Sequence, residues 1–273
     1  MAEIEYVEGY PLGLLVPESK PMTIPTFADA VGVLSKDAIA KILNESGRVA
    51  GRKRFPARQW IKNQGKRGSC NAYAGCAALE RARDFCSCKR VVLGPEYLYS
   101  NINGGRDQGS LLEDGRVSLT EVGCPPKEYV RYESYLKREQ TPEGHANAGR
   151  FRILESYGIH SEEELATALA LNYMAVIALH VTNAFMRLDG DGVAGGADGP
   201  GNHALCAHDV RIKGNDYQFE LPGSWDLSYG DEGHCWTTWN RHYRKTVNYH
   251  QFSAIRTTTD DPQGDTHLPG RAA

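Results

Sequence analysis

The sequence lacks a long block of one charge, a long apolar run and a dense set of cysteines. Its 273 residues carry 31 Lys and Arg against 34 Asp and Glu, and no basic stretch is long enough to act as a nucleic-acid footprint. The short cluster Arg52–Arg54 reads as solvated surface, and no window approaches the length of a membrane span. Seven cysteines are too sparse for a disulfide scaffold, and their odd number leaves at least one without an intramolecular pair. We expect no nucleic-acid partner and no membrane attachment.

The first twenty residues also lack the pattern of a signal peptide. MAEIEYVEGYPLGLLVPESK has acidic residues where basic ones are needed, and prolines interrupt its apolar stretch. We therefore expect a cytoplasmic protein.

The chain divides into an arm, a domain and a tail. Residues 1–53 are punctuated by prolines and predict an extended N-terminal arm with one helix, SKDAIAKILNESG, capped by Ser35 and stopped at Gly47. Residues 54–255 are expected to hold the folded core, since 41% of the chain is apolar, and this length allows one large domain or two small ones. Residues 256–273 form a polar C-terminal tail. Such tails fray unless something holds them, so a larger assembly that holds the termini is a further expected partner.

Helical patterns come first along the domain and strand patterns second. Helices are expected from Cys70, after Pro95, in SLLEDGRVSLTEVG, and in SEEELATALALN, where Ser161 and Glu164 occupy capping-box positions. Strands are expected in MAVIALHV, HALCAHDVRIKG and NDYQFELPGSW. This order predicts an α+β fold, with a helical half packed on an antiparallel sheet or barrel half.

The stretch NQGKRGSCNAYAGCAALERA, residues 63–82, contains a candidate nucleophile. Cys70 begins its helix, where the helix dipole favours a thiolate. Such a nucleophile needs a base and donors for an oxyanion. Gln64 could fold back beside the sulfur, and His203 in GNHALCAHDV follows 133 residues later. The alternative for Cys70 is a small buried core residue.

These segments resemble those of the papain-like cysteine proteases. NQGKRGSCNAYAGCA is similar to the active-site segment NQG-x-CGSCWAFA, and GNHAL is similar to the histidine segment. YQFELPGSWDLSYGDEG is similar to the segment Y-W-x-x-K-NSWG-x-x-WG-x-x-G. The resemblance covers residues 54–245 and implies a papain-like fold, with Cys70 as nucleophile and His203 as general base and acid. It further implies an oxyanion hole made by Gln64 and the Cys70 backbone N–H.

The sequence departs from the family pattern at three positions. Gly223 stands where the family has an Asn that orients the histidine, so Asn202, Asp209 or a backbone carbonyl would have to substitute. Asn71 replaces the aromatic residue after the nucleophile. Arg67 replaces a disulfide cysteine, and it would favour the thiolate if it pointed toward the sulfur.

Two functions follow from this pattern. The first is a papain-like cysteine peptidase or amide hydrolase with a peptide or protein substrate and no cofactor. The alternative is a catalytically impaired papain-fold structural or binding protein, such as a component of a virus or phage particle, which would place it in the virion. Gly223, Asn71 and the apparent lack of a propeptide to keep a protease silent favour the alternative.

Other polar clusters have plainer interpretations. Cys86 and Cys88 are too closely spaced for an ordinary zinc half-site, and no second pair matches them, so we expect no metal site. The loop 189–201 faintly resembles a calcium loop but lacks the terminal Glu, so we expect a solvated turn. Trp236 and Trp239 fit a half-buried strand, with a binding surface as the alternative.

Overall fold

The computed structural model describes residues 4–19, 24–47, 61–85 and 90–257. The arm-to-domain boundary at 53/54, the basic cluster 52–54, Cys86, Cys88 and nearly all of the tail lie outside the described residues.

The expected helices are present in the described part of the chain. The helices are α1 (Phe27–Ala30), α2 (Lys36–Glu45), α4 (Cys70–Phe85), α5 (Pro95–Ile102), α6 (Leu112–Glu121), α7 (Pro142–Ala148) and α8 (Glu162–Ala170). Ser35 caps α2 by accepting from the backbone N–H of Ala38 at 3.2 Å, and Ser161 and Glu164 form the predicted capping box of α8. The short helices α1 and α7 were not expected. None of the helices described here has both the length and the apolar character needed to cross a bilayer.

The strands form two main antiparallel sheets and one hairpin. The strands are β1 (Glu5–Val7), β2 (Tyr10–Leu12), β3 (Ile153–Ile159), β4 (Met174–Leu179), β5 (His203–Ala207), β6 (Asp209–Lys213), β7 (Asp216–Pro222), β8 (His234–Thr237) and β9 (Phe252–Thr257). The sheet orders are β3-β9-β4-β5 and β6-β7-β8, with β1 and β2 paired separately. The expected strand HALCAHDVRIKG divides at His208, which lets β5 join one sheet and β6 the other.

Two strands escaped the sequence analysis. β3 and β9 were not expected, and the edge strand β3 is completed by pairing with β9 near the end of the domain. Trp236 does lie in a strand, but Trp239 begins a π-helical turn, so the single half-buried strand expected over both residues is wrong.

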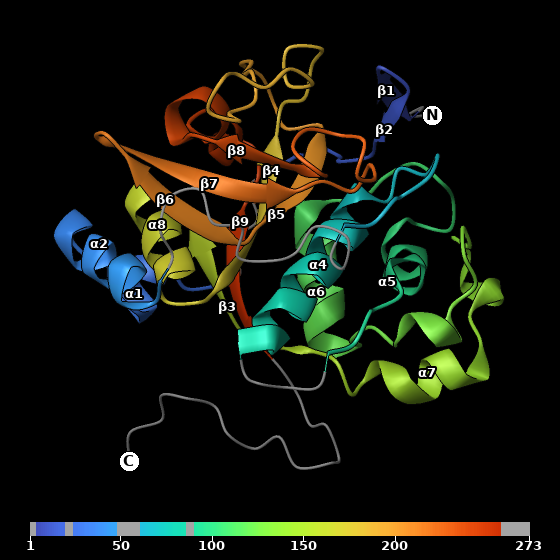
Figure 1. Cartoon of the computed structure of the whole chain (residues 1–273). Helices are drawn as coiled ribbons and strands as arrows, with labels where there is room; N and C mark the ends of the chain where they lie inside the picture. The colour runs from blue at the N-terminus through green and yellow to red at the C-terminus, as the bar shows by residue number, and fades with distance from the viewer. Residues whose placement is uncertain (1–3, 20–23, 48–60, 86–89, 258–273) are drawn as a thin grey trace, which may run out of the picture.

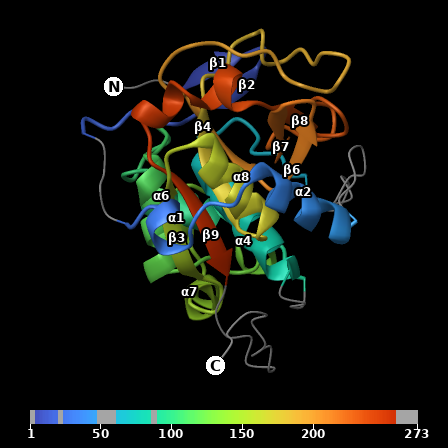
Figure 2. The same ribbon diagram turned by 90° about the vertical axis from the view of Figure 1, so that its left-hand side faces the viewer.

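Helix α4 occupies the centre of the fold. Figure 1 shows it between the strands on one side and α5 and α6 on the other, and its contacts with β4, β5 and β9 agree. Ala72, Ala78 and Leu79 are fully buried, so this helix is enclosed rather than amphipathic. In the turned view of Figure 2, α8 covers the sheet on the side where α1 and α2 also lie. The predicted α+β architecture is confirmed.

Candidate functional site

Cys70 is the first residue of α4, as expected, and its side chain is completely buried. Burial raises the pKa of the thiol, while hydrogen bonds with the backbone of Ala204 and Gly13 act in the opposite direction. Because burial wins, the thiol is protonated in this state. The helix-start position alone therefore does not produce the thiolate that the sequence suggested.

His203 begins β5, the strand that packs against α4. Its neighbour Ala204 reaches the Cys70 sulfur, so the predicted nucleophile and base come from adjoining elements. The imidazole is fully buried and lies on the ring of Trp225, with centroids 4.3 Å apart and planes 27° apart. No described residue forms a hydrogen bond with either ring nitrogen of His203, and the Cys70 sulfur forms none with them either. Burial lowers the pKa of His203 to about 3, so the ring is neutral.

None of the expected substitutes for the orienting Asn reaches His203. The side-chain oxygen of Asn202 accepts from Val181 N at 2.8 Å, and its nitrogen donates to Val181 O at 3.1 Å. An oxygen of Asp209 accepts from the backbone of Val210. Since the described residues leave both imidazole nitrogens without a partner, the ring is held by packing on Trp225.

Gln64, the expected oxyanion donor, is buried, and its side-chain amide is held by hydrogen bonds. Its side-chain oxygen accepts from the hydroxyl of Ser224, and its backbone N–H donates to Ser224 O at 2.8 Å. This fixes the amide so that its nitrogen donates to the carbonyls of Arg67, at 2.9 Å, and Pro11, at 3.3 Å. Pro11 O is a peptide carbonyl, the chemical group that an oxyanion hole binds.

Pro11 belongs to an N-terminal segment that passes over the candidate site. Leu14 N donates to Asn202 O at 3.1 Å, and Leu15 N donates to Ser110 O at 3.0 Å. Ser110 N in turn donates to Gly13 O at 3.0 Å, and Leu14 pairs with Ser110 in parallel. Residues 11–15, which we call the covering segment, are thus held in an extended conformation beside Cys70, with hydrogen bonds to Ser110 and to Asn202.

Glycine makes this crossing feasible. A Cβ added to Gly13 would lie 2.0 Å from the backbone oxygen of Gly68 and 2.3 Å from its carbonyl carbon. A Cβ on Gly109 would lie 2.2 Å from Gly13 O. Three backbones therefore meet where no side chain fits. The sequence analysis missed this role, although the apolar run Leu12–Leu15 around a glycine was a signal that these residues are buried.

Two departures from the family motif have structural explanations. Arg67 does not approach the sulfur, because its guanidinium pairs with Asp107 at 3.3 Å and lies 4.4 Å from the centre of the Tyr135 ring. The suggestion that Arg67 favours the thiolate is therefore wrong in this state. Asn71 is buried and donates to Leu111 O at 2.6 Å, which links α4 to the start of α6.

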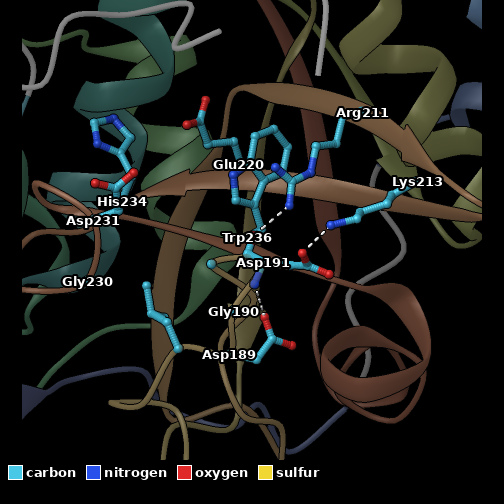
Figure 3. Close-up of a pocket in the computed structure, with 12 residues that line it drawn as sticks. Asp189, Gly190, Asp191, Arg211, Lys213, Glu220, Gly230, Asp231, His234 and Trp236 are labelled. Atoms are coloured by element: carbon cyan, nitrogen blue, oxygen red, sulfur yellow. Dashed lines mark hydrogen bonds and ion pairs between the residues drawn. The ribbon is translucent and has the colours of Figure 1, made fainter. Parts of the chain in front are cut away.

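An open pocket of about 600 Å³ lies away from Cys70, on the β6-β7-β8 sheet. Figure 3 shows the loop carrying Asp189 and Asp191 below Arg211, Lys213 and Trp236. Asp189 accepts from the backbone of residues 191 and 193, and Asp191 and Asp198 form ion pairs with different lysines. These carboxylates are therefore engaged separately, each with its own partners.

A buried cluster beside this pocket has metal-ligand residue types. Ligand atoms of His208, Glu220 and His234 lie within 4.8 Å of one another. However, Arg81 Nε donates to His208 Nδ1 at 2.7 Å, so the imidazole proton sits on Nε2, which faces Glu220 at 3.1 Å. Metal-bound histidines instead donate their second nitrogen to an acceptor. The chemistry of the cluster therefore suits a buried Arg–His–Glu network better than a metal.

Stability is expected to fall on acidification because of the buried histidines. Burial lowers the pKa of His203 to about 3 and that of His250 to about 4, so the unfolded chain binds protons at higher pH than the folded one. Their stabilisation is complete above pH 6.5 and is lost as the pH falls toward 4, by about 1.4 kcal/mol per pH unit for each histidine. Urea unfolding between pH 7.5 and 4.5 measures this slope. His203→Gln should reduce it.

Comparisons with known proteins agree with this description. No family model matches the chain. The chain is 28% identical over 182 residues to Peptidase 1 of Dermatophagoides pteronyssinus, a match that spans 64% of this chain and only 55% of that protein. The chain therefore spans about half the length of the curated relative it matches.

Solved structures share the fold at low identity. A cysteine protease from Xylella fastidiosa, Xylellain, superposes with a TM-score of 0.67 at 18% identity, covering 94% of this chain and 99% of that one. The proform of cathepsin B from Trypanosoma congolense gives a TM-score of 0.64 at 15% identity, covering 91% and 87%. The chain therefore has the papain-like α+β fold of these cysteine proteases, and its sequence is similar to that of Peptidase 1.

Proposed function

We propose that the protein is a cysteine peptidase or amide hydrolase that is latent while the covering segment is seated. Cys70 is the nucleophile and His203 the general base and acid. The Gln64 amide and the Cys70 backbone N–H stabilise the oxyanion. The substrate is a peptide or protein chain bound in extended form.

The observation that carries this proposal is the bound covering segment itself. It is an extended peptide with three backbone hydrogen bonds to Ser110 and Asn202, and its Pro11 carbonyl accepts from the Gln64 amide. A cleft that holds one extended chain beside a helix-start cysteine can hold another. In this proposal residues 11–15 take the place of a propeptide, because they cover the thiol.

The chemistry follows once the segment leaves. When the covering segment moves away, water reaches Cys70 and His203. This removes the burial that favours the neutral forms of both side chains. Proton transfer from sulfur to imidazole then gives the thiolate, which attacks the substrate carbonyl. His203 protonates the leaving amine, and water hydrolyses the thioester to regenerate the thiol.

One observation favours the catalytically impaired alternative. Among the described residues no acceptor orients His203, and an imidazole held only by stacking on Trp225 has no fixed tautomer. A binding protein would use the same peptide cleft without turnover.

Labelling and turnover together separate these functions. The protein is treated with a thiol-directed epoxide at mildly acidic pH, before and after limited proteolysis of its N-terminal residues, and the adduct is mapped by mass spectrometry. After the proteolysis we expect selective labelling of Cys70. We also expect the protein to hydrolyse members of a peptide library, an activity that the Cys70→Ala variant should lack. Labelling no faster than a free thiol, with no hydrolysis, would support the binding protein.

A further inference from the structure

Two buried cysteines outside the site lie in direct contact. Cys76 is in the second turn of α4, and Cys124 directly follows α6 and its closing glycine, 48 residues away. Both side chains are fully buried, and their sulfur atoms are 3.4 Å apart. A disulfide bond needs about 2.05 Å between sulfurs, so the two atoms would have to approach by about 1.4 Å.

The backbone on the Cys124 side is held firmly in this place. Cys124 N donates to Phe151 O at 3.0 Å, and Gly94 N donates to Pro125 O at 2.9 Å. The Cys124 sulfur also lies 3.2 Å from Gly94 O. The contact between the two sulfurs is therefore part of an ordered crossing between α4 and the chain that leaves α6.

A charged pair lies beside the thiols. Lys62 donates to Glu80 and to Leu93 O at 3.2 Å. Burial, with Cys124 and Glu80, raises the pKa of the Cys76 thiol well above its usual value in the folded protein, and the Lys62 charge acts in the opposite direction. An ammonium group near a thiol favours the thiolate that disulfide exchange requires. Because the pair is closed off from solvent in the folded protein, exchange needs a partly open chain.

We propose that Cys76 and Cys124 are a redox pair that closes to a disulfide bond when a small disulfide oxidant meets the folding chain. One thiolate attacks the oxidant and forms a mixed disulfide, releasing one thiol from the reagent. The second protein thiolate then displaces the other reagent thiol. The protein loses two electrons and two protons, and the oxidant is reduced to two thiols. The bond links the nucleophile helix to the segment after α6 and leaves Cys70 as a thiol.

Oxidative refolding tests the pairing directly. The full chain is refolded in oxidised and reduced glutathione, alkylated with N-ethylmaleimide in denaturant and digested without reductant. We expect one linked peptide joining Cys76 to Cys124, with Cys70 alkylated. Reduction should lower the Tm of the oxidised protein by about 5–10 °C, because the bond closes a long loop.

Two variants control for effects unrelated to the pair. Cys124→Ala should show no reductant-dependent shift in Tm, whereas Cys206→Ala, which removes another buried thiol, should retain it. If Cys124→Ala does not fold, Cys124→Ser replaces it, and the wild-type peptide map decides alone. Alkylation of both Cys76 and Cys124 after oxidative refolding, or linkage of Cys76 to a different cysteine, would overturn the proposal.

Discussion

Gly13→Ala is expected to raise both the rate of Cys70 alkylation and the rate of peptide hydrolysis by about 10- to 100-fold. The new Cβ would overlap backbone atoms of Gly68 at 2.0 to 2.4 Å, and no side-chain rotation relieves a clash with backbone. Overpacking of this kind costs about 1–3 kcal/mol, and each 1.4 kcal/mol shifts an equilibrium about tenfold. The covering segment can avoid this cost by leaving the cleft, so the open form becomes more populated.

The matched control is another glycine-to-alanine change with room for the methyl group. Gly149 has no atom within 4 Å of an added Cβ, and its φ of −63° suits any residue. Gly149→Ala should therefore leave alkylation and hydrolysis at the wild-type rates. The latency proposal is wrong if Gly13→Ala folds with the wild-type Tm but reacts no faster than Gly149→Ala.

Gly223→Asn, made in the Gly13→Ala protein, is expected to raise kcat/KM by about 10- to 1000-fold. The amide would supply the acceptor that both imidazole nitrogens of His203 lack among the described residues. Loss of an orienting group costs about 10⁴ in triad enzymes, so restoring one recovers part of that factor. The space is tight but usable, because an added Cβ would lie 3.1 Å from a Tyr229 ring carbon and 3.3 Å from Gly233 O.

Gly223→Ala separates orientation from crowding. It adds the same Cβ without the amide, so it should give no gain or a small loss. A pH profile of kcat/KM adds an independent readout. An acceptor for the imidazolium raises the pKa of His203, so the part of the profile that reports the titration of His203 should move to higher pH. Equal activity of the Asn and Ala variants would show that the missing acceptor does not limit this site.

These two predictions describe different restraints on the same site. In our proposal the covering segment controls access to Cys70, whereas the change at Gly223 tests the orientation of His203. Gly13→Ala should increase labelling even if hydrolysis stays slow. Labelling without turnover would therefore identify a peptide-binding protein whose thiol is accessible but whose imidazole is poorly oriented.

Local sequence patterns were enough to predict several parts of the fold. Ser35, Ser161 and Glu164 begin helices because their side chains bond backbone groups only three residues away. The same locality explains why Cys70 was correctly assigned to a helix start. The strands β3 and β9 were missed because each is stabilised by a partner far along the chain, which local sequence patterns do not reveal.

The sequence by itself determined the candidates for chemistry: Cys70 at a helix start, His203 at a strand start, and Gln64 beside a tight turn. Only the tertiary structure decided their state. Cys70 and His203 are completely buried, the described residues leave both His203 ring nitrogens without a hydrogen-bond partner, and the sulfur atoms of Cys76 and Cys124 lie 3.4 Å apart. The reason is physical. Residue types and local spacing specify which groups a chain can offer, but burial and hydrogen-bond partners depend on how distant segments pack, and these set the pKa values on which catalysis depends.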